Sequence, residues 1–301
     1  MHFQYEQLSA LVAVIREGNF DRAARSLHVT SSAISQRVKQ LEEQVGGTVV
    51  VRAAPCTPTA LGATIYRHAL QVELLEKDLL GAVAPANALG ARFATPMTLA
   101  VNADSLATWL VPAIARFVAA TELQVEIVVD DQDYTAAWLR SGRVLGAVTA
   151  EARPVQGCRV RPLGVMRYLA TASPAFARRW FPKGAPPEAL RRAPALTFNR
   201  KDELQERFVR RVLGGRAGQL RAHMVPSPTA FVEACLLGLG WGMNPELLAE
   251  PHLRTKRLVQ MVADKWLDVP LYWQQWGLAS DSLNALAAAL EAQADKALRP
   301  L

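Results

Sequence analysis

The sequence predicts a winged helix-turn-helix at the N-terminus, then a long linker helix, then an α/β domain, and three observations support this order. Residues 20–41 read as two short helices joined by a tight turn. Residues 61–82 place a seam of side chains alternately four and three positions apart, which is typical of a helix with one buried stripe. From residue 97 onward, strand and helix patterns alternate, which favours parallel sheets whose strands are joined by helical crossovers.

The helix pair has the features of a DNA-reading unit. Asn19 is a good cap for a first helix over 20–27, His28 and Val29 form the break, and Thr30 is placed to cap the second helix. In the second helix, apolar residues recur with helical spacing, and the opposite face carries hydroxyls, amides and cations. Such a face suits a major groove, while an ordinary amphipathic hairpin with a solvated polar face is the alternative.

A wing is expected beside this helix, because 48–51 is β-branched and 52–58 carries two prolines. Gln36 and Arg37 are long enough to reach base edges, adenine and guanine being their usual partners. Short hydroxyls and the free N–H groups at the helix N-terminus suit phosphate. The residues expected to contact DNA are Thr30, Ser31, Ser32, Ser35, Gln36, Arg37, Lys39, Gln40, Arg52 and Pro58.

These motifs resemble the N-terminus of LysR-type transcriptional regulators. The likeness rests on SAISQRVKQLE at 32–42, on the wing, and on PTALG at 58–62. Farther on, AVNADSLATWLVPA at 100–113 is similar to the ArgP/LysG branch, which senses basic amino acids and controls genes such as their exporters. Two positions depart from the pattern. Ser31 stands where the family often has Gln, and Thr57 stands where the branch commonly has Arg, which leaves Arg52 to hold phosphate beside the wing.

The resemblance implies a winged helix-turn-helix, a dimerising linker helix and a two-lobed α/β effector domain of periplasmic-binding-protein type. The expected units are residues 1–58 for DNA binding, 59–90 for the linker helix and hinge, and 91–301 for the effector domain, with lobe 1 at about 91–164 and 267–301 and lobe 2 at about 165–266. Strands are expected at 97–101, 125–129, 145–149, 168–171, 195–198, 239–243 and 271–276, and helices near 106–119, 135–140, 174–180, 201–213, 229–237, 245–250 and 282–298.

The seam of the linker helix needs a partner, because a lone helix would leave it in water. Since the family is dimeric through this linker, a homodimer or homotetramer is implied, and the alternative is a helix packed on its own domain. The DNA-binding domains of two protomers would then face DNA, with about 34 Å or a multiple of it between their centres. A roughly palindromic double-stranded operator is therefore expected. The resemblance also implies contact with RNA polymerase.

Composition narrows the classes of protein. The chain has 301 residues and is 50% hydrophobic, which suits two or three compact units. Without an apolar run of about 20 residues or a secretion leader, a cytoplasmic protein without membrane contact is expected. Cys56, Cys158 and Cys235 lack metal-binding spacing and are expected to be buried or incidental thiols, with redox sensing by one of them as the alternative. No metal and no cofactor are expected.

The net charge of +7 is weak evidence for DNA binding because of where it lies. Residues 1–60 hold six Lys and Arg against five Asp and Glu, whereas residues 153–221 hold sixteen against four. An Arg-rich solvated surface is the expected explanation of this excess. The alternative is that this half of the effector domain touches DNA phosphates or attracts an anionic partner.

Polar residues follow several predicted strands, at the edge where ligands bind in such folds. Asn102, Asp104 and Ser105 come where a strand ends and a helix begins, which suits the α-carboxylate and α-ammonium of an amino acid. A carboxylate after another strand would pair a distal cation. The effector-binding candidates are Asn102, Ala103, Asp104, Ser105, Trp109, Asp130, Asp131, Thr149, Phe198, Asp202, Ser227 and Thr229. Helix capping, a solvated acidic turn and core packing of Trp109 are the plainer alternatives.

Catalysis is not expected, because the five histidines form no metal-spaced pair and nucleophile motifs and phosphate loops are absent. The sequence therefore predicts a sequence-specific DNA-binding transcriptional regulator, switched by lysine or arginine bound between the lobes, which controls amino acid export or metabolism genes. Ligand closure of the lobes would change protomer packing and DNA bending. The alternatives are a nonspecific nucleoid-type DNA binder and a cytoplasmic solute-binding module.

Overall fold

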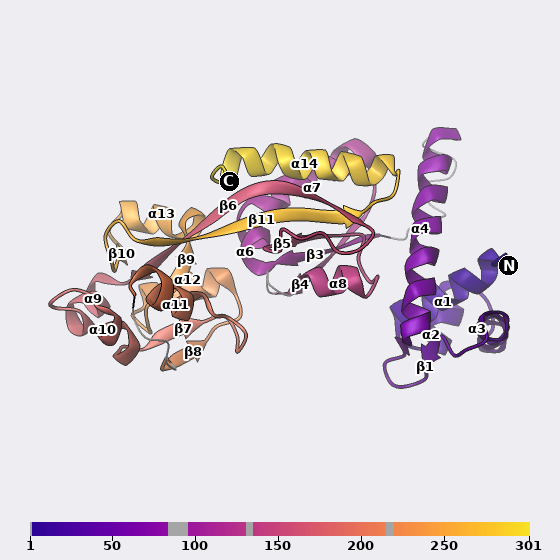
Figure 1. Cartoon of the computed structure of the whole chain (residues 1–301), viewed down its shortest axis with the longest axis horizontal. Helices are drawn as coiled ribbons and strands as arrows, with labels where there is room; N and C mark the ends of the chain where they lie inside the picture. Colours follow the sequence, from indigo (N-terminus) through magenta and orange to yellow (C-terminus); the bar gives the residue numbers. More distant parts are fainter. Residues whose placement is uncertain (1, 84–95, 131–134, 215–219) are drawn as a thin grey trace.

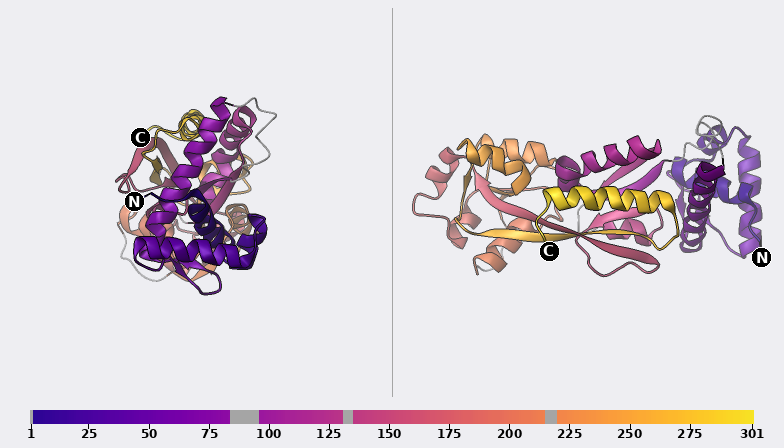
Figure 2. Two further views of the ribbon diagram at one scale, coloured as in Figure 1. Left: turned by 90° about the vertical axis from the view of Figure 1, so that its right-hand side faces the viewer. Right: turned by 90° about the horizontal axis from the view of Figure 1, so that it is seen from above.

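The computed structural model describes residues 2–83, 96–130, 135–214 and 220–301. The molecule is elongated, with the N-terminal helices at one end and the α/β domain extending away from them (Figures 1 and 2). The hinge expected at 85–96 lies almost wholly outside the described residues, as does the candidate Asp131.

Three helices form the N-terminal domain: α1 (Tyr5–Glu17), α2 (Phe20–Ser26) and α3 (Ser31–Val45). Both predicted caps are present: Asn19 Oδ1 accepts from the Asp21 N–H at 2.8 Å, and Thr30 Oγ1 accepts from the Ala33 N–H at 3.2 Å. The helix α1, for which the sequence analysis made no prediction, precedes the expected pair. That helix buries apolar side chains such as Leu11 and Val14 against the other two.

The wing is a short antiparallel pair, β1 (Val50–Val51) and β2 (Thr57–Pro58), which is shorter than the strand expected at 48–51. The linker helix α4 (Ala60–Val83) begins directly after it. One face of α4 is buried through residues such as Ile65 and Leu70 and packs on α1. Its predicted seam is partly open, with Leu75 and Leu79 exposed.

One curled sheet runs through the α/β domain in the order β10-β6-β11-β5-β3-β4, with β9 also paired to β6. Its strands are β3 (Met97–Asn102), β4 (Val125–Asp130), β5 (Gly146–Thr149), β6 (Cys158–Ala172), β9 (Gly242–Pro245), β10 (Val259–Gln260) and β11 (Trp266–Trp276). The prediction of parallel sheets was wrong for most pairings. Within this sheet only β3 pairs in parallel, with β4 and β5, whereas the pairings of β6 with β9, β10 and β11 and of β11 with β5 are antiparallel.

The reason is that two long strands, β6 and β11, run in opposite directions through the whole domain (Figure 1). The strand expected at 168–171 is only the end of β6, and the one at 271–276 is half of β11. Residues 165 and 267, where the chain was expected to change lobes, lie within these two strands. We use lobe 1 for the elements around β3, β4 and β5, and lobe 2 for those between β6 and β11.

Lobe 1 contains α6 (Ala103–Ser105), the π-helical turn η1 (Leu106–Leu110), α7 (Val111–Thr121), α8 (Thr135–Arg140) and α14 (Asp281–Ala297). Lobe 2 contains α9 (Pro174–Trp180), α10 (Pro187–Arg192), β7 (Ala195–Thr197), α11 (Leu204–Arg207), η2 (Phe208–Val212), β8 (Ala222–Met224), α12 (Pro228–Leu236) and α13 (Glu246–Arg254). The helix expected at 201–213 is shorter. The strand expected at 239–243 begins only at Gly242, because a turn occupies the preceding glycines.

The elements α6, η1 and α7 form one continuous helix, Ala103–Thr121, which is long and apolar enough to cross a membrane by length and composition alone. The sequence expectation that no such stretch exists was therefore wrong. In the structure this helix belongs to lobe 1, where it packs on α14 through buried residues such as Ala113 and Phe117. Its first turn faces the site described below.

Candidate DNA-reading surface and ligand pocket

The polar face of α3 is open to solvent along its length. Thr30, Ser32, Gln36, Lys39 and Gln40 are exposed, and Ser35 and Arg37 are half-buried. The opposite stripe of Ile34, Val38 and Leu41 is fully buried, as the spacing predicts. The helix therefore presents hydroxyls, amides and cations outward, while its other face holds it against α1 and α2.

Two of the candidate residues have structural partners. The Ser31 hydroxyl donates a hydrogen bond to the carboxylate of Asp21 in α2. This bond ties the N-terminus of α3 to the preceding helix and uses the Ser31 proton. Lys39 lies 3.6 Å from Glu43 one turn along the helix, an exposed pair that contributes little to stability.

The wing carries a further cation, Arg52. Arg52 is exposed and its guanidinium lies 5.0 Å from the centre of the Phe20 ring, at the start of α2. Pro58 pairs with Val50 across the wing. Thr57 is exposed beside it and supplies no charge. The DNA-binding role of these residues stays a prediction.

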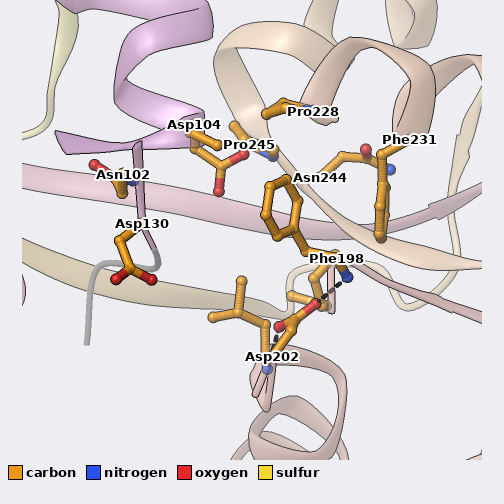
Figure 3. Close-up of a pocket in the computed structure, with 12 residues that line it drawn as sticks. Asn102, Asp104, Asp130, Phe198, Asp202, Pro228, Phe231, Asn244 and Pro245 are labelled. Atoms are coloured by element: carbon orange, nitrogen blue, oxygen red, sulfur yellow. Dashed lines mark hydrogen bonds between the residues drawn. The ribbon is translucent and has the colours of Figure 1, made fainter. Parts of the chain in front are cut away.

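A pocket of about 480 Å³, counted with its open mouth, lies between the two lobes. The part of this space that can hold the centre of a water-sized sphere is about 40 Å³, well below the range of about 300–1,000 Å³ that is common for small-molecule sites. Figure 3 shows residues from both lobes facing one space. The lining residues are Asn102, Ala103, Asp104, Asp130, Phe198, Asp202, Leu204, Pro228, Phe231, Met243, Asn244 and Pro245.

Strand pairing explains the lobe 1 side of the pocket. Asn102 and Asp130 end the parallel strands β3 and β4 and lie opposite each other in register. Parallel strands bring their carboxyl ends to one edge, so these two polar side chains meet there. The indole N–H of Trp138 in α8 donates to Asp130 Oδ2 at 2.9 Å, which fixes one carboxylate oxygen.

Asp104 follows in the first turn of the helix Ala103–Thr121. The hydroxyl of Tyr168 donates a hydrogen bond to Asp104 Oδ2 at 2.7 Å, and Tyr168 is fully buried in β6. This contact joins the start of the lobe 1 helix to a strand that continues into lobe 2. It also holds the carboxylate in one orientation at the pocket.

On the lobe 2 side, Asp202 mainly supports its own loop. Its Oδ2 accepts from the Phe198 N–H at 2.8 Å, and its Oδ1 accepts from the Leu204 N–H at 3.0 Å (Figure 3). Phe198 and Phe231 provide aromatic surface to the pocket. The loop after β7 is therefore closed by the same carboxylate that the sequence suggested as a ligand contact.

Five candidates lie outside the lining. Trp109 is a core residue, 1% exposed, and its indole N–H donates to the buried Ser105 hydroxyl at 3.1 Å. Thr149 is fully buried and accepts from the Glu151 N–H at 3.1 Å. Ser227 caps α12 and Thr229 contacts its hydroxyl, while the intervening Pro228 lines the pocket. Capping and packing, the plainer alternatives, account for these contacts.

Sequence reasoning missed several lining residues and one residue that supports them. Phe231, Asn244 and Pro245 line the pocket, and Tyr168 orders Asp104. Asn244 and Pro245 directly follow the strand expected at 239–243 and were not selected, whereas Phe231 lies inside a predicted helix and Tyr168 inside a predicted strand. Asn244 follows the glycine-rich stretch of lobe 2, and only its pairing with β6 reveals its position.

The three cysteines are free thiols, and two of them are buried. Cys56 and Cys235 are the buried ones and Cys158 is half-buried. Burial raises the pKa of Cys235 to about 12 and that of Cys158 to about 11, so both remain protonated at neutral pH. Among the described residues, no group of three or more His, Cys, Asp and Glu is placed to hold a metal ion.

Two protein-family models match the chain. The model of the bacterial regulatory helix-turn-helix protein, lysR family, matches residues 5–63, and that of the LysR substrate binding domain matches residues 91–298. The first match contains α3 and the wing, and the second contains every residue that lines the pocket.

Known proteins resemble the chain over nearly its whole length. It is 45% identical to the HTH-type transcriptional regulator LysG of Mycobacterium tuberculosis (strain ATCC 25618 / H37Rv), covering 98% of this chain and 97% of the relative. It is 42% identical to the HTH-type transcriptional regulator ArgP of Pseudomonas fluorescens (strain Pf0-1), covering 99% of each.

Solved structures agree with the fold. The crystal structure of ArgP from Mycobacterium tuberculosis matches with a TM-score of 0.86 at 43% identity, covering 98% of each chain. Full-length LysG from Corynebacterium glutamicum with bound effector Arg matches with a TM-score of 0.76 at 38% identity, covering 99% of this chain and 100% of that one. The chain therefore belongs to the LysR family of transcriptional regulators, with a DNA-binding helix-turn-helix domain and an effector-binding domain.

Proposed function

We propose that this regulator binds a basic amino acid, lysine or arginine, in the pocket between its lobes and thereby changes its binding to operator DNA. The observation that carries the proposal is the charge of the pocket. Asp104, Asp130 and Asp202 line it, and no Lys, Arg or His is among its described lining residues. Three carboxylates around one space, in a chain with net charge +7, favour a cationic ligand.

The lobe 1 wall suits the backbone of an amino acid. The side chain of Asn102 and the first N–H groups of the helix Ala103–Thr121 lie where an α-carboxylate would be held. Asp104, oriented by Tyr168, would accept the α-ammonium. The aliphatic stem would lie along Phe198 and Phe231, toward lobe 2. That LysG from Corynebacterium glutamicum was solved with arginine as its effector supports this choice of ligand.

The remaining assignments follow from the family. We propose a cytoplasmic homodimer or homotetramer joined through the exposed seam of α4, where Leu75 and Leu79 lie open. Each DNA-binding domain would place α3 in a major groove of a roughly palindromic operator. The regulator would also contact RNA polymerase at the promoter. Control of amino acid export or metabolism genes is the expected outcome of binding.

Titration calorimetry on the full-length protein tests the ligand. Lysine or arginine should bind, and Asp104→Asn should weaken binding at least tenfold, because a hydrogen bond to a charged group contributes about 1.5–3 kcal/mol. Asp295→Asn is the matched control, since it removes the same charge from an exposed position on α14. Heat with a neutral metabolite and none with either basic amino acid would reject the assignment.

A further inference from the structure

Asn244 is a pocket residue that the sequence analysis did not select. It lies on β9 in lobe 2, is 1% exposed and lines the pocket. Its backbone pairs with Leu169 of β6, so its place is fixed by the strand that joins the lobes. The other polar lobe 2 residue in the lining is Asp202, whose two oxygens accept backbone N–H groups.

The hydrogen bonds of Asn244 determine which way its amide points. Its Nδ2 donates to Thr171 Oγ1 at 2.8 Å and to Cys235 Sγ at 3.3 Å. The amide nitrogen is therefore directed into lobe 2, and the carbonyl oxygen is directed away from these partners.

That carbonyl oxygen is buried and has no hydrogen-bond partner among the described residues. Buried acceptors are nearly always satisfied, so an unsatisfied one beside a pocket indicates a missing donor. Six of the lobe 2 lining residues offer only apolar side chains: Phe198, Leu204, Pro228, Phe231, Met243 and Pro245. None of these side chains can supply that donor, and an occupant of the pocket that Asn244 lines can supply it.

We infer that Asn244 Oδ1 accepts a hydrogen bond from the distal cation of the ligand, opposite the lobe 1 wall formed by Asn102, Asp104 and Asp130. This inference rests on the proposed function and adds the lobe 2 half of the site. An ammonium brings three donors and a guanidinium five, so either satisfies the amide oxygen. A neutral side chain of equal length leaves it unsatisfied, so Asn244 selects basic over aliphatic amino acids.

The test measures binding of L-lysine, L-arginine and the neutral lysine analogue L-norleucine to the full-length protein by calorimetry. Asn244→Leu keeps the size and removes the acceptor. It should lower affinity for lysine and arginine about tenfold or more and leave norleucine unchanged, thereby removing the preference for a cation. Asn244→Asp keeps an oxygen at the same place and should retain that preference. Asn244→Ala replaces the leucine variant if leucine unfolds the protein.

Gln205→Leu is the matched control. Gln205 is also 1% exposed in lobe 2, its Nε2 donates to the Leu196 carbonyl at 2.6 Å, and its Oε1 is likewise buried without a partner among the described residues, but it does not line the pocket. Equal effects of the Gln205 and Asn244 variants would overturn the inference. So would binding by Asn244→Asp as weak as that by Asn244→Leu, because the native amide would then donate to a carboxylate. Failure of the wild type to bind lysine and arginine would reject the proposed function as well.

Discussion

The reading surface of α3 and the ligand pocket are built in opposite ways. The reading surface comes from one run of residues, 30–40, whose polar side chains are mostly exposed. The pocket gathers residues from 102 to 245, several of them buried, and needs two lobes to form. Helical spacing alone specifies the first, whereas strand pairing and loop closure specify the second.

Their charges differ as well. The first 60 residues are almost neutral, with six cations and five anions, whereas the pocket has three carboxylates and no cation among its described lining residues. Nonspecific binding to DNA depends on many neutralised phosphates, so a nearly neutral reader favours base contacts over a nucleoid-type role. The basic excess of residues 153–221 includes the exposed Arg178 and Arg179 of α9, at the far end of the molecule from α3 (Figure 1). Its expected role as a solvated surface stays a prediction.

The largest expected effect tests whether the two regions fold independently. Gly62, at the start of α4, lies so close to the wing that an added Cβ would be 1.8 Å from the Val49 carbonyl oxygen. Gly62→Ala should cost about 3 kcal/mol or more and abolish operator binding, because the wing and helix must separate. Arginine binding, measured by calorimetry on the same preparation, should persist.

The control for this variant is Gly46→Ala. Gly46 has φ of +73° with nothing within 4 Å of the added Cβ, so only backbone strain of about 1–2 kcal/mol is expected. Loss of arginine binding together with DNA binding in Gly62→Ala would show that the reader and the effector domain unfold as one unit.

A smaller effect is expected at the base-reading residues. Gln36→Ala and Arg37→Ala should each weaken binding to the specific operator by about 1–3 kcal/mol and leave binding to unrelated duplexes nearly unchanged. Lys39→Ala removes a side chain that is paired with Glu43. It should weaken binding to the operator and to unrelated duplexes by the same factor. Gel-shift titrations with both duplexes measure these affinities. An equal loss of affinity for both duplexes would show that Gln36 and Arg37 contact phosphates and not bases.

The smallest effect concerns the contact between α1 and the linker helix. Arg16 lies 3.8 Å from Glu73 of α4, yet burial raises the pKa of Glu73 more than Arg16 lowers it. The folded protein therefore binds a proton more tightly at Glu73 than the unfolded chain does. The contribution of Glu73 to the free energy of unfolding is therefore complete at low pH and is lost as the pH rises through the raised pKa of this carboxyl.

Glu73→Gln should accordingly gain stability relative to the wild type as pH rises from about 4.5 toward 8, by about 1 kcal/mol or less. Thermal unfolding of both proteins across this range measures the difference. A relative loss at high pH would mean that the Arg16 ion pair outweighs the cost of burying the carboxylate.

Sequence patterns were most reliable where structure is local. The caps at Asn19 and Thr30, the buried stripe of α3 and the family assignment are confirmed. The candidates Asn102, Ala103, Asp104, Asp130, Phe198 and Asp202 do meet at one pocket. Asn102 and Asp130 end the neighbouring parallel strands β3 and β4, whose carboxyl ends share one edge, which explains why these two were found together.

The site residues and strand directions that the sequence analysis did not predict correctly have physical causes. Trp109 and Ser105 stand one helical turn apart and bond to each other inside the core, a contact that a polar pattern does not reveal. Tyr168 and Asn244 depend on the register of β6 with β9 and β11, which is set by long-range pairing. The antiparallel direction of β6 and β11 was missed because each strand is longer than the apolar run that marked it.

The paired crossing strands also constrain how the lobes can move. β6 and β11 form one continuous ladder, and its single register shift, between Leu271 and Tyr272, lies beside Gly164, whose φ is +134°. Moving the lobes apart along this ribbon would stretch two nearly extended backbones, whereas twisting or bending it preserves the main-chain hydrogen bonds that run across it. A change in the angle between the lobes is therefore a twist or bend of this ribbon, and the two strands stay paired throughout.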